Sequence, residues 1–162
     1  MVDEHDIGLG LTIRASVDID TSPKDVGPHV SVVAELFEGR YVCTEIVIRE
    51  KREVGLTGTT LRDIAVGFYV EFAAEASNSG VEERLSDLAR EVMEASTRVT
   101  DDLLRTVATT YRWGYAVSGN PTAKIMQIFE IERPRAAAWV ARARERGFLG
   151  TTEMGRPGGV VS

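Results

Sequence analysis

The chain has 162 residues, 43% of them hydrophobic and 27% charged, which is typical of a globular protein with one or two small domains. It has no apolar run of about 18 residues that would cross a membrane, and residues 1–6 are acidic where a signal peptide would be basic. These features exclude a disordered or membrane-spanning chain, and we expect a cytoplasmic protein.

The net charge of −6 is distributed unevenly. Residues 105–162 contain nine basic and four acidic residues, a net charge of +5, so that residues 1–104 carry −11. A basic nucleic-acid-binding unit joined to an acidic partner unit would produce this asymmetry. Two oppositely charged halves that simply attract each other would produce it as well.

The first half of the chain predicts a small antiparallel sheet. Residues 8–20 alternate between apolar and polar side chains, as in a half-buried strand, and residues 21–28 form a loop with two prolines. Two further strands, at 30–37 and 40–49, meet across Glu38 and Gly39 and read as a hairpin, because glycine tolerates the positive φ of a tight turn.

Two helices follow these strands. One begins at Thr59 or Thr60 and runs to about residue 76, and a second covers residues 81–95. The apolar positions expected to form the buried face of the first are Leu61, Ile64, Ala65, Phe68, Phe72 and Ala73. We therefore predict an α+β module over residues 1–97, for assembly or ligand sensing. The helix is apolar around most of one turn, at Phe68, Tyr69, Val70 and Phe72. This pattern indicates either burial in the core or a homodimer interface.

From residue 100 the pattern is entirely helical. It predicts helices from 100 to about Gly114, from 121 to 129 and from 133 to 146, with Pro134 in the first turn of the last and Gly147 after its end. Two short helices joined by a short turn, with a helix before them, form the tri-helical helix-turn-helix plan. We assign this all-α domain to residues 98–150 and a flexible tail to residues 151–162.

A small shared core would fix how these helices cross. Its members are the apolar residues Ile125, Phe129, Ile131, Ala136, Trp139 and Val140. This core would hold the third helix outward, so that its first turns can enter the major groove, where arginine can bind guanine or phosphate. The residues expected to contact double-stranded DNA are Thr122, Lys124, Arg133, Pro134, Arg135, Ala137, Ala138, Arg142 and Arg144.

The string from Pro121 to Lys124, together with Phe129 and residues 131–149 (IERPRAAAWVARARERGFL), resembles the C-terminal segment of actinobacterial and actinophage helix-turn-helix proteins. The segments 39–42 and 60–64 are similar to the N-terminal halves of that family. The resemblance covers the last third of the chain most strongly and implies sequence-directed DNA binding.

The chain departs from the family pattern at several positions. Glu130 stands where glycine is usual, and it would cost stability if its φ is positive. Glu132 replaces the usual Ser or Thr cap, and Met126 fills the place of a small residue. Ala137 and Ala138 stand where polar side chains often read bases, and alanine discriminates little between bases.

No catalytic site is expected. A glycine-rich phosphate loop, a nucleophile elbow and an HExxH sequence are all missing. The single cysteine, Cys43, cannot form an internal disulfide, and neither histidine has a partner at ligand spacing. We therefore expect no metal, no cofactor and no enzymatic activity.

The sequence predicts a DNA-binding regulator or mobile-element factor that acts as a homodimer. The alternative is a degenerate helix-turn-helix protein that binds other proteins instead of DNA.

Overall fold

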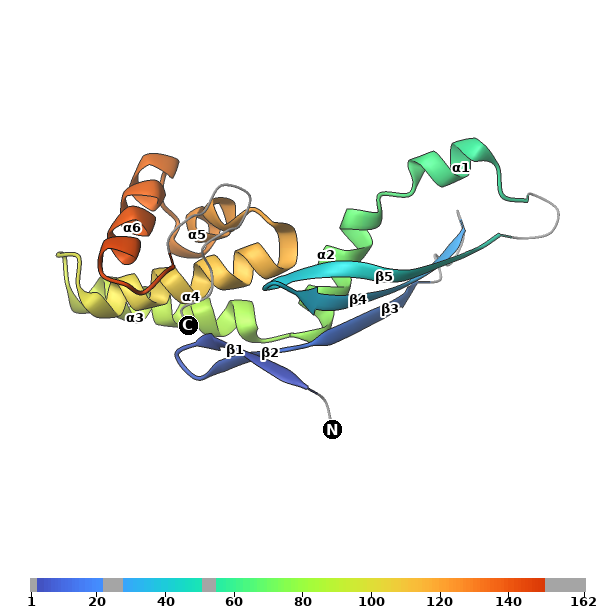
Figure 1. Ribbon diagram of the computed structural model, residues 1–162. Coiled ribbons are helices and arrows are strands. Elements are labelled where there is room, and N and C mark those ends of the chain that lie inside the picture. The colour runs from blue at the N-terminus through green and yellow to red at the C-terminus, as the bar shows by residue number, and fades with distance from the viewer. Residues whose placement is uncertain (1–2, 22–27, 51–54, 151–162) are drawn as a thin grey trace.

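The computed structural model describes residues 3–21, 28–50 and 55–150, and it confirms the predicted α+β class. A sheet lies at one end of the molecule and a group of helices at the other (Figure 1). Most of the predicted loop at 21–28 and all of the predicted tail at 151–162 lie outside the described residues. None of the described helices is both long and apolar enough to cross a membrane.

The single strand predicted over residues 8–20 is wrong, because this segment contains a turn and two strands. β1 (Glu4–Gly8) and β2 (Leu11–Arg14) form a hairpin, and Gly8, Leu9 and Gly10 all have positive φ, at 107°, 56° and 72°. At Ala15 the chain passes from one sheet to the other, since its N–H donates to Asp3 while its carbonyl accepts from Leu36. The alternating pattern continues through this junction and therefore hides it.

The second sheet has the order β3-β4-β5 and is antiparallel throughout. It comprises β3 (Ser16–Thr21), β4 (His29–Phe37) and β5 (Arg40–Arg49), and it confirms the predicted hairpin. Glu38 and Gly39 form the turn, with φ of 48° and 77°. One face of β4 is fully buried through Val30, Val32 and Ala34.

The helix predicted from residue 59 to 76 is two helices. α1 (Gly58–Asp63) is capped by Thr57, and two non-helical residues separate it from α2 (Val66–Ser77). α2 packs on β3, β4 and β5, and it buries Val70, Ala73 and Ala74. Of the predicted buried face, Ala73 is confirmed, but Phe68 and Phe72 are wrong, because they are 62% and 46% exposed. The two small alanines let the helix lie close to the sheet, and this choice turns the phenyl rings toward solvent.

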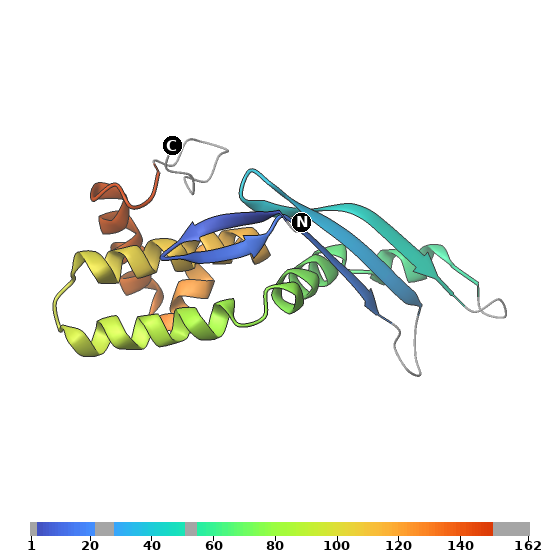
Figure 2. The ribbon, with the colours of Figure 1, turned by 90° about the horizontal axis from the view of Figure 1, so that it is seen from below.

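α3 (Val81–Ala95) matches its prediction, and α4 (Asp101–Ser118) lies at the centre of the helical end. α3, α5, α6 and β1 all contact α4, and Figure 2 shows the β1–β2 hairpin lying along it. α4 continues four residues beyond its predicted end at Gly114. This glycine marks a close helix approach: a Cβ there would lie 2.6 Å from the Cβ of Lys124.

The two halves share one connected core. The predicted boundary at residues 97 and 98 falls between α3 and α4, which pack against each other. Arg112 of α4 joins distant parts of the chain, since its guanidinium donates to the carbonyl oxygens of Ile7 and Phe148 at 3.2 and 2.6 Å. Burial lowers the pKa of Arg112, and the negative charge of Asp6, which acts to raise it, does not outweigh burial. The first strand and the segment after α6 are therefore both held on α4.

Candidate nucleic-acid interface

Two short helices and a three-residue turn form the candidate interface. α5 (Pro121–Phe129) begins at Asn120, whose side-chain oxygen accepts from the Ala123 N–H, and Pro121 occupies its first turn. α6 (Arg133–Glu145) follows residues 130–132. Both helices lie where the sequence predicts them, because capping and proline placement are local features.

Glu130 ends α5 in the left-handed conformation, with φ of 52°. Its N–H and that of Ile131 both donate to the Met126 carbonyl oxygen. A side chain with a Cβ is disfavoured in this conformation, which explains why glycine is the usual residue at such a turn. Glu132 precedes α6 and makes no side-chain cap. The turn is thus formed without either of its preferred residues.

A small aromatic and aliphatic core fixes the angle between α5 and α6. The rings of Phe129 and Trp139 meet edge to face with centroids 5.5 Å apart. Ile125 and Ala136 are completely buried beside them. Met126 is half-buried and packs against the same core, so the helices accommodate the larger side chain.

The outward face of α6 is formed by small and basic side chains. Its exposed residues include Arg133, Pro134, Arg135, Ala137, Ala138, Ala141 and Arg142. The guanidinium of Arg135 lies 4.8 Å from the centroid of the Trp139 ring. No carboxylate of the described residues lies within ion-pair distance of Arg133, Arg135 or Arg142. These three charges therefore remain available for an anionic partner.

Lys124 does not lie on this face. Only 8% of its side chain is exposed, and its Nζ lies 3.1 Å from Glu75 of α2 and 3.0 Å from Glu82 of α3. Burial alone lowers the pKa of Lys124, but hydrogen bonds and charges from Glu82 and Glu75 outweigh it, so the pKa is raised. Lys124 therefore joins α5 to α2 and α3 within the protein, and it does not lie where it was expected to contact DNA.

Two other expected contacts are less accessible than the exposed residues of α6. Arg144 lies against Tyr111 of α4, with its guanidinium 5.2 Å from the ring centroid and a hydrogen bond of 3.1 Å to the hydroxyl. Thr122 is half-buried in the first turn of α5. Of the expected contacts, the structure thus leaves Arg133, Pro134, Arg135, Ala137, Ala138 and Arg142 exposed on α6, whereas Thr122, Lys124 and Arg144 are half-buried or buried.

The structure adds Arg98, which the sequence-based argument missed. Arg98 lies between α3 and α4 and lines a hollow of about 230 Å³ together with Arg135 and Trp139. It is exposed and has no ion-pair partner among the described residues. No local pattern marks it, because its place beside α6 depends on how α3 packs against α4.

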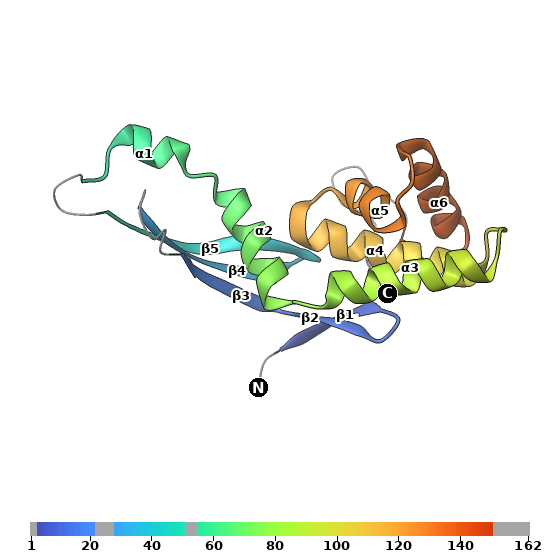
Figure 3. The same ribbon diagram turned by 180° about the vertical axis from the view of Figure 1, so that it is seen from behind.

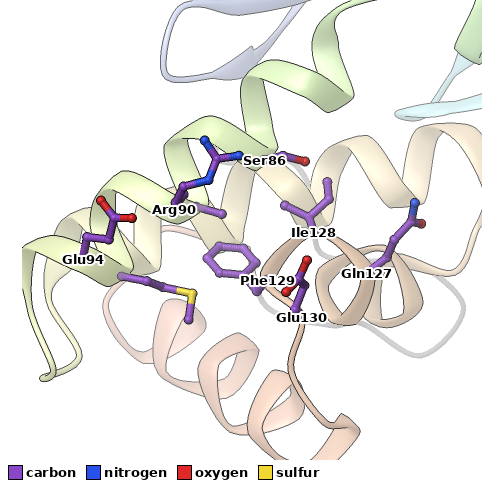
Figure 4. Close-up of a pocket in the computed structure, with 9 residues that line it drawn as sticks. Ser86, Arg90, Glu94, Gln127, Ile128, Phe129 and Glu130 are labelled. Carbon is purple, nitrogen blue, oxygen red and sulfur yellow. The ribbon is translucent and has the colours of Figure 1, made fainter.

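A second groove, of about 370 Å³, lies between α3 and α5 (Figure 4). Ile128 and Phe129 contribute apolar lining, while Arg90, Glu94 and Glu130 bring charges of both signs. Arg90 also pairs with Asp87. This groove has no net positive character and does not extend the basic surface formed by α6 and Arg98. The described residues contain no cluster of three or more His, Cys, Asp or Glu side chains suited to a metal ion.

Comparison with known proteins gives no relative. No family model, no curated protein and no solved structure matches this chain.

Proposed function

We propose that this protein binds double-stranded DNA through α6 and is not an enzyme. The observation that carries the proposal is the outward face of α6, where Arg133, Arg135 and Arg142 are exposed and have no described carboxylate partner. Arginine binds phosphate oxygens and the guanine edge. The small side chains of Ala137 and Ala138 would allow the helix to approach the groove floor closely.

The proposed role is that of a transcriptional regulator or a phage- or mobile-element-type DNA-binding factor in the cytoplasm. The resemblance of residues 121–149 to actinobacterial and actinophage helix-turn-helix proteins supports this role. Alanines at 137 and 138 supply little base discrimination, so we expect modest sequence preference and a large contribution from phosphate contacts.

We further propose that the protein acts as a homodimer through its N-terminal half. Phe68 and Phe72 of α2 are largely exposed, with parallel rings whose centroids are 6.2 Å apart. Exposed aromatic pairs of this kind are typical of protein interfaces. Two DNA-binding units in one dimer would gain avidity that one short unit lacks.

The alternative is a protein-interaction module that has kept the helix-turn-helix fold without binding DNA. Glu130 and Glu132 favour it, because both are exposed at the turn beside the proposed reading helix and would repel phosphates. The flat alanine surface of α6 would suit close packing against another helix as well as a DNA groove.

A pair of double variants separates these two functions. Arg133→Ala/Arg135→Ala should retain the fold and lose most duplex binding in a fluorescence-anisotropy titration. Arg84→Ala/Arg90→Ala is the matched control, because it removes the same charge from α3, where both arginines pair with carboxylates. DNA binding requires that only the first variant be impaired. Equal affinity of both variants and the parent would overturn the proposed α6 contacts, and a parent that binds no duplex would favour the protein-interaction module.

A further inference from the structure

α1 projects from the molecule without a packing partner of its own (Figure 3). None of its residues is buried, and Leu56 and Leu61 expose 46% and 51% of their surface. A single helix of six residues is marginal in water unless another surface supports it. The apolar side chains of this segment therefore need a surface that the described part of the chain does not supply.

α2 presents an exposed apolar surface next to α1. Phe68 and Phe72 lie on one stripe of the helix, Val66 is 38% exposed, and Ala76 continues the stripe. Together with Leu56 and Leu61, these side chains expose roughly 400 Å² of apolar surface per protomer, the size of a typical functional patch. Two such surfaces would bury roughly 800 Å² of apolar side chain, and backbone and polar atoms would have to supply the rest of the roughly 1,200 Å² that a specific interface buries.

We propose that α1 of one protomer packs on α2 of a second copy of this chain, and reciprocally, about a two-fold axis at Gly67. This inference rests on the proposed homodimer and names its interface. The chain contains both the projecting helix α1 and the α2 surface that would receive it, which is the self-complementarity of an isologous contact. A partner with different chemistry would need to match both surfaces at once.

Gly67 supports this position of the axis. It lies exposed in the first turn of α2, and a Cβ added there would meet nothing within 4 Å. Glycine destabilises a helix relative to alanine, and nothing in the described part of the protomer requires it here. On a two-fold axis, however, the missing side chain would let two α2 helices approach closely.

Charge supports the same pairing. Arg62 of α1 is exposed, Glu71 of α2 is half-buried, and neither has an ion-pair partner among the described residues. In the sequence, Arg62 follows Leu61 directly, and Glu71 lies between Phe68 and Phe72. When Leu61 packs on the phenyl rings of the second copy, Arg62 approaches Glu71 of the partner subunit.

Cysteine cross-linking in a Cys43→Ser background tests the arrangement. Gly67→Cys alone should form a disulfide-linked dimer, because the two thiols meet on the axis. Leu61→Cys mixed with Ala76→Cys should also cross-link, whereas each of these variants alone should not. Thiols held together have a high effective concentration, so the expected rates exceed those of the single variants at 61 and 76 by on the order of tenfold or more.

Sedimentation of the full chain separates the possible failures. Phe68→Ala/Phe72→Ala should weaken the dimer at least about tenfold, while Phe37→Ala should leave it unchanged, since Phe37 is 67% exposed but lies on β4. A dimer without these cross-links would overturn the packing of α1 on α2 of the second copy, but it would leave the proposed homodimer standing. A monomer at micromolar concentration would overturn both, and DNA binding by that monomer would still support the role of α6.

Discussion

The Nζ of Lys124 lies 3.0 Å from a carboxylate oxygen of Glu82, and this contact joins α5 to α3 across 42 residues of sequence. The same Nζ lies 3.1 Å from Glu75, and Gln127 also donates to Glu82, at 2.7 Å. The second helix of the candidate DNA-binding unit is thereby fixed to the junction of α2 and α3. The orientation of α6 consequently depends on residues of the N-terminal half.

Lys124→Met should lower the free energy of unfolding by about 1–3 kcal/mol, because it leaves two carboxylates without their cation while keeping the aliphatic stem. The lower end applies because Glu75 and Glu82 are 39% and 35% exposed and keep contact with water. Urea unfolding measures the change. Arg84→Met is the control, because it removes an exposed ion pair and should change the stability by less than about 0.5 kcal/mol. A loss no larger than the control's would contradict a structural role for Lys124.

Gly114→Ala should destabilise the protein by about 1–3 kcal/mol, because the added methyl would lie 2.6 Å from the Cβ of Lys124 and 2.9 Å from the Cα of Pro121. Backbone atoms of α5 cannot move aside without shifting the helix. Gly58→Ala provides the comparison, since its Cβ would meet only the end of Arg62 at 3.8 Å. If thermal unfolding shows the same change for both variants, α4 and α5 do not approach as closely as described.

Glu130→Gly should stabilise the protein by about 1 kcal/mol, because it relieves a non-glycine residue with φ of 52°. The same change at Glu132, where φ is −72°, should have no such benefit. Comparing the two unfolding midpoints isolates the backbone effect from the shared loss of charge. Equal shifts would indicate that charge, not conformation, decides the outcome.

Stability should fall at alkaline pH through Tyr41 and Lys124. Burial raises the pKa of Tyr41, against the Asn78 hydrogen bond and the Arg14 charge, and the pKa of Lys124 is raised by its two carboxylates. Both shifts favour the protonated form in the folded state. Their contribution is complete below the ordinary values of 10.0 and 10.5 and is lost as pH rises through the folded-state values.

Urea unfolding from pH 7 to 11 tests this dependence. The parent should lose stability above about pH 10, and a Tyr41→Phe/Lys124→Met variant should lose less over the same interval. If the variant shows the same alkaline loss as the parent, other groups are responsible for it.

The elements that local rules define were predicted well. The turn at Glu38 and Gly39, the helix over residues 81–95 and the start of α5 at Pro121 all depend on neighbouring residues. The buried face of α2 was predicted only in part, because Ala73 is buried as expected whereas Phe68 and Phe72 of the same predicted face are exposed. Helical periodicity alone cannot distinguish a small buried side chain from a large exposed one.

Tertiary contacts account for the remaining differences in the candidate site. Lys124 has the position of a DNA contact in the sequence, but Glu75 and Glu82 bury it from 49 and 42 residues away. Gly114 looks like a helix end, yet it serves the crossing of α4 and α5. Arg98 joins the basic face only because α3 and α4 pack together. The arginines of α6 were predictable, since they lie on one continuous helix.

The salt dependence of duplex binding tests the proposed DNA interface most directly. With at least three arginines on phosphates, the logarithm of the binding constant should fall against the logarithm of salt concentration with a slope of about −2.7 or steeper. In Arg133→Ala/Arg135→Ala the slope should become shallower by about 2, while Arg84→Ala/Arg90→Ala should keep the parent's slope. A parent that binds no duplex at low salt, or whose affinity does not change with salt, would contradict the proposal that α6 is a DNA-binding helix.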